Sequence, residues 1–172
     1  MRIWAAIGKL TACGAILALS LGMFTGCAKK GKDTELVKVD ENFSGKAVIT
    51  VDGTEYSADI QRGGSDMWQW EFSAPQTVEG MAISCSGNSA RLEFMGLSYE
   101  TDRDNIPESS AVTLTSAAID KLISQKGCTA VVNDKGVTTV SGQVKGQDFY
   151  AKFKGDKLQS LDISTEVSVK FK

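Results

Sequence analysis

Residues 43–61, FSGKAVITVDGTEYSADIQ, form two runs in which apolar and polar side chains alternate, and Asp52-Gly53 separates the runs. Asp-Gly between alternating runs is a strong hairpin signal, because a type I′ turn needs positive φ at both central residues. A two-residue loop there pairs Val51 with Thr54, Ile49 with Tyr56, Ala47 with Ala58 and Gly45 with Ile60. Both apolar sets then share one face, so the stretch predicts an antiparallel hairpin with one buried side.

The same pattern recurs downstream. A turn at Gly87-Asn88 predicts the pairs Cys85 with Ala90, Ile83 with Leu92 and Met81 with Phe94, and a turn at Lys145-Gly146 predicts Gly142 with Phe149 and Val140 with Ala151. Further alternating faces are Trp68, Trp70 and Phe72, then Leu161 and Ile163, then Val167, Val169 and Phe171. The spacing predicts a mainly β (α+β) chain with about nine short antiparallel strands, in one curved sheet, an open half-barrel or a barrel.

One segment breaks the period of two. In PESSAVTLTSAAIDKLISQKG, residues 107–127, Ala118, Ile119, Leu122 and Ile123 recur at helical spacing. Ser110 and Thr115 are alternative N-caps, and Gly127 is the expected terminating residue. A lone helix within a series of antiparallel strands is expected to cover the concave face of the sheet.

The N-terminus is typical of an export signal. Arg2 and Lys9 precede Leu10–Phe24, a segment without charged side chains that is rich in Leu, Ala and Gly. A charged region followed by about 7–15 apolar residues is the layout of a signal peptide. The apolar segment is shorter than the roughly 20 residues of a membrane-spanning helix.

Phe24-Thr25-Gly26-Cys27 resembles the lipobox of bacterial lipoproteins, which implies cleavage before Cys27 and a diacylglyceryl thioether on its sulfur. Leu10-Thr11-Ala12-Cys13 also fits the box, but cleavage there leaves too short an apolar region before it. An ordinary secretory peptide and an uncleaved anchor are the alternatives. Two acyl chains give a stable anchor, so the protein is expected on a bacterial cell membrane, facing outside the cytoplasm.

These features divide the chain into three expected parts. They are a lipoprotein signal peptide, a lipidated N-terminus with a flexible linker, and a β domain, at residues 1–26, 27–42 and 43–172.

Several stretches together resemble the small lipoproteins of the LolA/LolB-like superfamily. They are WEFSAPQTVEGMAIS (70–84), RLEFMGLSYE (91–100), a proline before a lone helix, and LQSLDISTEVSVKF (158–171). The resemblance implies an open, strongly curved sheet covered by helices, with lipid or acyl chains held in the hollow. Some members instead act through a bound partner protein, which implies an envelope scaffold or chaperone-like role as the alternative.

The composition argues against several kinds of chemistry. The chain contains no histidine, which excludes Ser-His-Asp, Cys-His and zincin sites. Its net charge of −2 is not that of a nucleic-acid binder. Asp102, Asp104 and Glu108 suggest a calcium loop, but Ile106 occupies the third ligand position and the loop glycine is missing. We therefore expect a non-catalytic protein with no metal and no cofactor besides the acyl anchor on Cys27.

Two cysteines remain once Cys13 is removed and Cys27 is acylated. Cys85 lies on a predicted core face, and Cys128 directly follows the helix. An exported domain permits a disulfide between them, which would connect the sheet to the end of the helix. Two separate buried thiols are the alternative.

The large apolar side chains of the concave face are the candidate ligand site. Trp68 and Trp70 are either core residues or part of an apolar wall, and aromatic residues commonly line ligand pockets. In the second case the predicted cavity is lined by Trp68, Trp70, Phe72, Met81, Ile83, Phe94 and Leu122.

Overall fold

The computed structural model describes residues 37–64 and 66–172. Cys13, Cys27 and the predicted signal peptide lie outside the described residues, which all belong to one compact unit. Within the described part of the chain, no helix combines the length and hydrophobicity needed to cross a membrane.

The described chain forms eleven strands, one α-helix and one short 3₁₀ helix. The strands are β1 (Ser44–Val51), β2 (Thr54–Gly63), β3 (Met67–Ala74), β4 (Ala82–Ser86), β5 (Ser89–Phe94), β6 (Leu97–Asp102), β7 (Thr129–Val132), β8 (Val137–Val144), β9 (Gln147–Lys154), β10 (Lys157–Ile163) and β11 (Val167–Phe171). The helices are η1 (Arg103–Asn105) and α1 (Ala111–Ser124).

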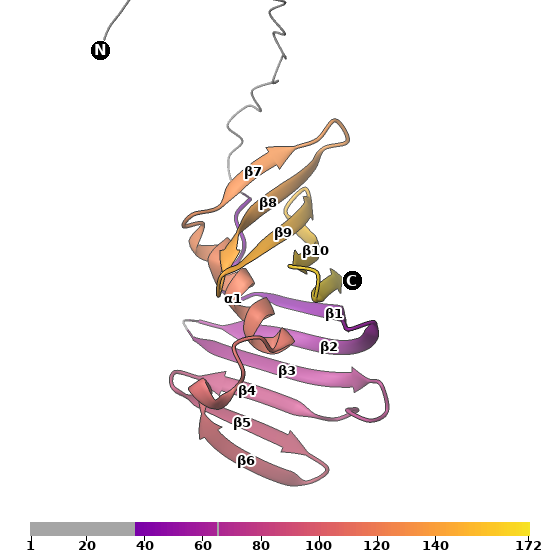
Figure 1. The fold of residues 1–172 in the computed structure, drawn as a ribbon, viewed down its shortest axis with the longest axis vertical. Helices are drawn as coiled ribbons and strands as arrows, with labels where there is room; N and C mark the ends of the chain where they lie inside the picture. The colour runs from indigo at the N-terminus through magenta and orange to yellow at the C-terminus, as the bar shows by residue number, and fades with distance from the viewer. Residues whose placement is uncertain (1–36, 65) are drawn as a thin grey trace, which may run out of the picture. The chain divides into compact units, whose positions relative to one another are not determined.

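All strands belong to one antiparallel sheet, in the order β6-β5-β4-β3-β2-β1-β11-β10-β9-β8-β7 (Figure 1). The first and last strands, β1 and β11, pair in the middle and leave β6 and β7 as open edges. The prediction of a mainly β, open antiparallel sheet with one α-helix is confirmed. The predicted number of about nine strands was too low, because the two edge strands were not counted.

The predicted hairpin registers occur with one exception. All four pairs around Asp52-Gly53 form, and these two residues have φ of 49° and 77°, as a type I′ turn requires. The pairs around Gly87-Asn88 and Lys145-Gly146 form as well. The pair of Met81 with Phe94 was wrong: the β4–β5 ladder ends at Ala82, and the Met81 carbonyl accepts a hydrogen bond from the Phe72 N–H at 2.9 Å.

Helix α1 begins at the earlier of the two candidate caps. The Ser110 hydroxyl accepts a hydrogen bond from the Thr113 N–H at 3.2 Å, which satisfies one of the unpaired amides of the first turn. The helix ends at Gln125, which adopts the left-handed conformation at φ 56° and donates its N–H to the Lys121 carbonyl. The prediction that Gly127 terminates the helix was therefore wrong by two residues.

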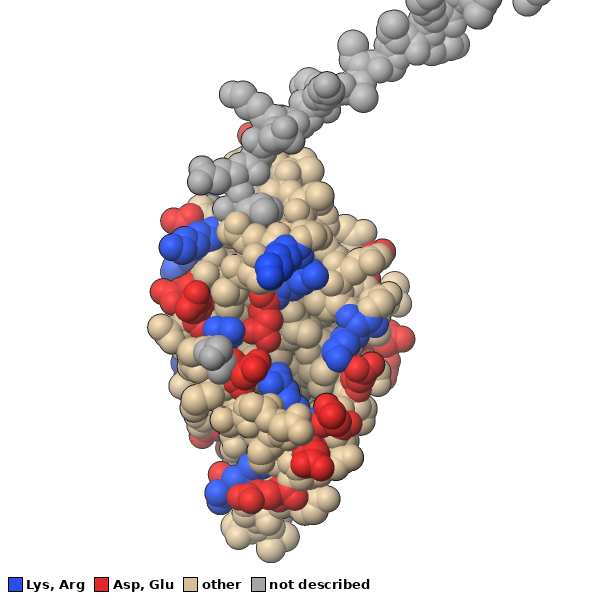
Figure 2. All heavy atoms as spheres, turned by 90° about the vertical axis from the view of Figure 1, so that its left-hand side faces the viewer, with Lys and Arg blue, Asp and Glu red and all other residues tan. Residues whose placement is uncertain are grey.

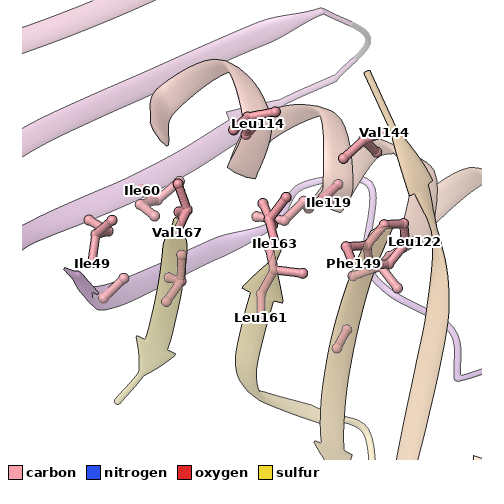
Figure 3. Packing of buried hydrophobic residues seen from close by; sticks show 14 of the residues in the cluster. Ile49, Ile60, Leu114, Ile119, Leu122, Val144, Phe149, Leu161, Ile163 and Val167 are labelled. Atoms are coloured by element: carbon pink, nitrogen blue, oxygen red, sulfur yellow. The ribbon is translucent and has the colours of Figure 1, made fainter. Parts of the chain in front are cut away.

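The core lies between α1 and the face of the sheet that α1 covers. Figure 3 shows side chains of α1 and of the strands pointing into one shared space: Ile49, Ile60, Leu114, Ile119, Leu122, Val144, Phe149, Leu161, Ile163 and Val167. Each of these side chains is buried, so the helix and sheet form a single core.

The segment before β1 is not a free linker over its whole predicted length. Val39 is buried in the core, and the Val37 carbonyl accepts a hydrogen bond from Gln125 Nε2 at 3.4 Å. Arg62 Nη1 donates to the Glu41 carbonyl at 2.6 Å. Residues 37–42, the end of the predicted linker, therefore contact the domain through Val37, Val39 and Glu41.

Candidate functional site

Polar contacts attach α1 to strands β2 and β3. Arg62 Nε donates to Asp120 Oδ1 at 2.7 Å, and Trp68 Nε1 donates to Asp120 Oδ2 at 3.3 Å. The Arg62 guanidinium also lies over the Trp68 ring, 6.0 Å from its centroid. One turn earlier in the helix, Ser116 Oγ accepts a hydrogen bond from Trp70 Nε1 at 3.3 Å. Both indole N–H groups of β3 are thus satisfied by side chains of α1.

Four of the seven predicted cavity residues are core residues. Trp68, Trp70, Phe72 and Leu122 are buried in the core cluster, and the rings of Trp70 and Phe72 stack at 6.3 Å. For Trp68 and Trp70 this is the core alternative, and Phe72 and Leu122 belong to the same core cluster.

The remaining three predicted residues lie where the helix no longer covers the sheet. Met81 and Ile83 are partly buried and pack against the margin of the core, and Phe94 is half-buried in β5. The structure therefore divides the predicted residues into a filled part, on β3 and α1, and a less covered part, at Met81 and in β4 and β5.

One row of directly paired residues shows this transition. The pairs Ile60 with Trp70, Trp70 with Ile83, Ile83 with Leu92 and Leu92 with Tyr99 run across β2 to β6. Because paired residues of adjacent strands point to the same side of a sheet, the row lies on the face that α1 covers. The exposed fraction is 0% at Trp70, 39% at Leu92 and 64% at Tyr99.

A second pair extends the same open face. Phe94 pairs with Leu97, which is 76% exposed. We call the surface formed by these side chains the apolar platform; its residues are Ile83, Leu92, Phe94, Leu97 and Tyr99.

The platform is open because the helix is shorter than the sheet is wide. With 14 residues, α1 is about 21 Å long. Eleven strands at about 4.8 Å spacing make a sheet about 48 Å wide. The segment around η1 adds some cover at the other end of β4 and β5, where Cys85 and Ala90 are buried and Ile106 packs against the core.

Three pockets of the described chain are not lined by platform residues. A groove of about 640 Å³ runs along α1 and is lined by Asp66, Cys85, Arg103, Asp104, Ile106, Glu108, Val112, Thr113, Ser116, Ala117, Asp120 and Lys145. Two further pockets of about 880 and 870 Å³ lie around residues 38–45. None of these three contains a residue of the predicted cavity, and the charged lining of the groove does not suit an apolar ligand.

Of the two alternatives for the remaining cysteines, a disulfide or two separate thiols, the structure has the second. Cys85 and Cys128 are both free thiols. Cys85 lines the groove with Ser116 of α1, whereas Cys128 lies beyond the end of the helix, where its Sγ contacts the Lys121 carbonyl at 3.7 Å. Burial raises the pKa of both thiols, and nearby Arg103 and Lys121 offset this only in part.

The acidic residues of the suggested calcium loop do not converge. Glu108 Oε1 accepts a hydrogen bond from Lys145 Nζ at 2.7 Å, and Asp102 is the last residue of β6. Among residues 37–64 and 66–172, no group of three potential metal ligands comes together. Figure 2 shows acidic and basic side chains interspersed on the face in view, without a patch of one sign.

Three platform residues were missed at the sequence level. Leu92, Leu97 and Tyr99 alternate with charged or polar neighbours, so their pattern was available. Alternation predicts which side chains share a face, but it does not tell how far a helix extends over that face.

Comparisons with known proteins leave the family open. No family model matches the chain, and no curated protein matches it. Among solved structures, an uncharacterized conserved protein from Thermus thermophilus is similar at a TM-score of 0.46 and 10% sequence identity, over 74% of each chain.

Proposed function

We propose that this protein is a non-catalytic lipoprotein, anchored on the outer side of a bacterial cell membrane, that binds a partner protein of the envelope through the apolar platform. The observation that supports it is the row from Trp70 to Tyr99, in which a core-type face continues into solvent. Exposed apolar surface of this kind commonly marks an interaction site.

A protein partner fits the platform better than an enclosed small molecule. Small ligands are usually surrounded on most sides within a pocket, whereas the platform is an open face of three strands. Tyr and Phe, both present on it, are enriched in the cores of protein interfaces. The space beneath α1 is occupied by core side chains, which supports the platform over this space as the binding surface.

The proposed anchor restricts where this surface acts. Val37, the first described residue, follows Cys27 by ten positions, a length of chain that spans at most about 35 Å. Acylation of Cys27 would therefore hold the domain close to the membrane, within reach of other envelope proteins.

A lipid or other acyl group on the same platform is the second candidate. It is supported by the continuity of the platform with Met81 and Ile83 at the margin of the core. Mass spectrometry of the intact protein, purified from its host under native conditions, distinguishes the two candidates. A bound lipid adds the small mass of a lipid without a covalent bond, whereas a partner protein adds the mass of a whole protein.

The test uses the full chain in its own host. Replacing both Leu92 and Tyr99 by Ser removes the exposed apolar side chains, and Met67→Ser is the matched control because Met67 is 55% exposed and lies outside the platform. After mild detergent extraction, we expect the wild type and the Met67 variant to migrate as a complex and the double variant as a monomer. Identical migration of all three would contradict partner binding.

The anchor is tested separately by labelling with a fatty acid. The label should be incorporated by the wild type and by Cys13→Ala, and it should be absent from Cys27→Ala. Labelling that persists without Cys27 would overturn this part of the proposal.

A further inference from the structure

The platform ends at an open strand edge. Strand β6 pairs only with β5, and all of its residues except Thr101 are exposed. The β5–β6 ladder contains six consecutive pairs without a bulge. Such an edge presents a row of unpaired backbone groups, to which another extended chain can pair.

The hydrogen-bond pattern determines which backbone groups of β6 are free. The Arg103 N–H donates to the Asn88 carbonyl at 2.9 Å, so Arg103 faces β5. In an antiparallel ladder, bonded and non-bonded pairs alternate. Leu97, Tyr99 and Thr101 therefore bond to β5, while the N–H and C=O groups of Ser98, Glu100 and Asp102 point away from the sheet.

Edge strands of soluble proteins commonly carry features that prevent such pairing. Charged side chains, lysine above all, proline and bulges are the usual ones. Strand β6, with the sequence LSYETD, has no lysine, proline or bulge, and its two charged residues, Glu100 and Asp102, are both acidic. The opposite edge strand, β7, is shorter, with four residues. Of the two edge strands, β6 is therefore better suited to pair with an added strand.

The side chains of β6 specify what an added strand should carry. Leu97 and Tyr99 lie on the platform side, so alternate side chains of the added strand would face an apolar surface. Glu100 and Asp102 lie on the other side, where Arg91 is shared between Glu93 at 2.7 Å and Glu100 at 3.7 Å. This side is acidic overall, and opposite charges on adjacent strands attract.

We propose that β6 is the docking edge for an extended segment of a partner protein, in which apolar side chains alternate with Lys or Arg. The proposal rests on partner binding at the platform and names the form that the partner takes there. A second copy of this chain is disfavoured, because its own β6 would place Glu100 and Asp102 beside the same acidic residues.

Binding of a synthetic peptide to the purified full chain tests the proposal. The probe is the fluorescently labelled, capped heptapeptide KVKIKVK, and the control peptide has Glu in place of each Lys. We expect the Lys peptide to bind more tightly than the Glu peptide, and its binding to weaken as salt is added. No binding of the Lys peptide, or equal binding of the two, would overturn the proposal.

Two variants at one position separate strand addition from other binding at the same surface. Ser98→Pro removes an N–H that faces away from the sheet, which an edge strand tolerates, and Ser98→Thr retains it. We expect the Pro variant to lose about tenfold or more in peptide affinity, as for the loss of a backbone hydrogen bond, and the Thr variant to bind as the wild type does. Equal peptide affinity of both variants would exclude strand addition. If peptide affinity falls only in the Leu92/Tyr99 double variant, strand addition is again excluded, but the proposed function of the platform stands.

Hydrogen exchange of the wild type gives a second measurement that needs no variant. The amides of Ser98, Glu100 and Asp102 should exchange rapidly in the free protein and become protected when the peptide is added. Unchanged exchange at these three amides would contradict the proposal. A concentration-dependent dimer in sedimentation that is absent in Ser98→Pro would show instead that a second copy occupies this edge.

Discussion

At the scale of the residue, the two tryptophans of β3 show what the sequence can and cannot predict. Alternation placed Trp68 and Trp70 on one face, which the structure confirms. Whether they are core or ligand wall depends on their hydrogen-bond partners, Asp120 and Ser116, which are 52 and 46 positions away along the chain. Nothing local to β3 indicates these partners.

Asp120 should matter for stability more than an exposed charge does. Asp120→Ala removes the carboxylate that accepts from Arg62 Nε and from the Trp68 indole N–H, and the Arg62 side chain is only 11% exposed. We expect the free energy of unfolding to fall by about 1–3 kcal/mol. Urea denaturation of the purified protein measures the change.

Lys46→Ala is the matched control, because it removes the ion pair with Asp59 on the exposed surface. Exposed pairs contribute at most about 1 kcal/mol. An equal loss in both variants would mean that Asp120 does not hold the helix on the sheet.

At the scale of the element, local signals predicted the hairpins and failed at the edges. The turn at Asp52-Gly53 and the alternation on both sides of it agree on one register, so the pairing of β1 with β2 could be predicted, although β2 continues two residues past the predicted stretch, to Gly63. Strand β7, TAVV, does not alternate, and the alternation in β6 is limited to one short stretch, Leu97–Ser98–Tyr99–Glu100. Both exist because a neighbouring strand supplies their hydrogen bonds.

The turn between β1 and β2 should tolerate only residues that adopt positive φ. Gly53 has φ 77°, and Gly53→Val places a β-branched side chain in a conformation that it rarely adopts. We expect a loss of about 1–3 kcal/mol in unfolding free energy. Gly63→Val is the control, because Gly63 has no positive φ and a Cβ there meets only ordinary contacts at 3.9 Å. A similar loss at both positions, measured in urea, would argue against strain at the turn.

At the scale of the whole molecule, the helix is shorter than the sheet is wide: α1 is about 21 Å long and the sheet about 48 Å wide. Within the described chain, α1 lies on the connection from β6 to β7, and this connection leads from one edge of the sheet to the other. The helix covers the middle of the sheet and leaves the platform on β4–β6 open. The sequence predicted the sheet and the helix separately. Which strands the helix leaves uncovered depends on the strand order, and that order includes the pairing of β1 with β11 from opposite ends of the domain.

The central claim is that the platform contacts another protein at the membrane. The most direct test places the photo-crosslinking residue p-benzoylphenylalanine at Tyr99 of the full chain in its native host, with the same residue at Ser84, which is exposed on the opposite face of β4, as the control. The account predicts a discrete protein adduct from position 99 and none from position 84. The same adducts from both positions, a lipid adduct alone, or no adduct at position 99 would contradict it.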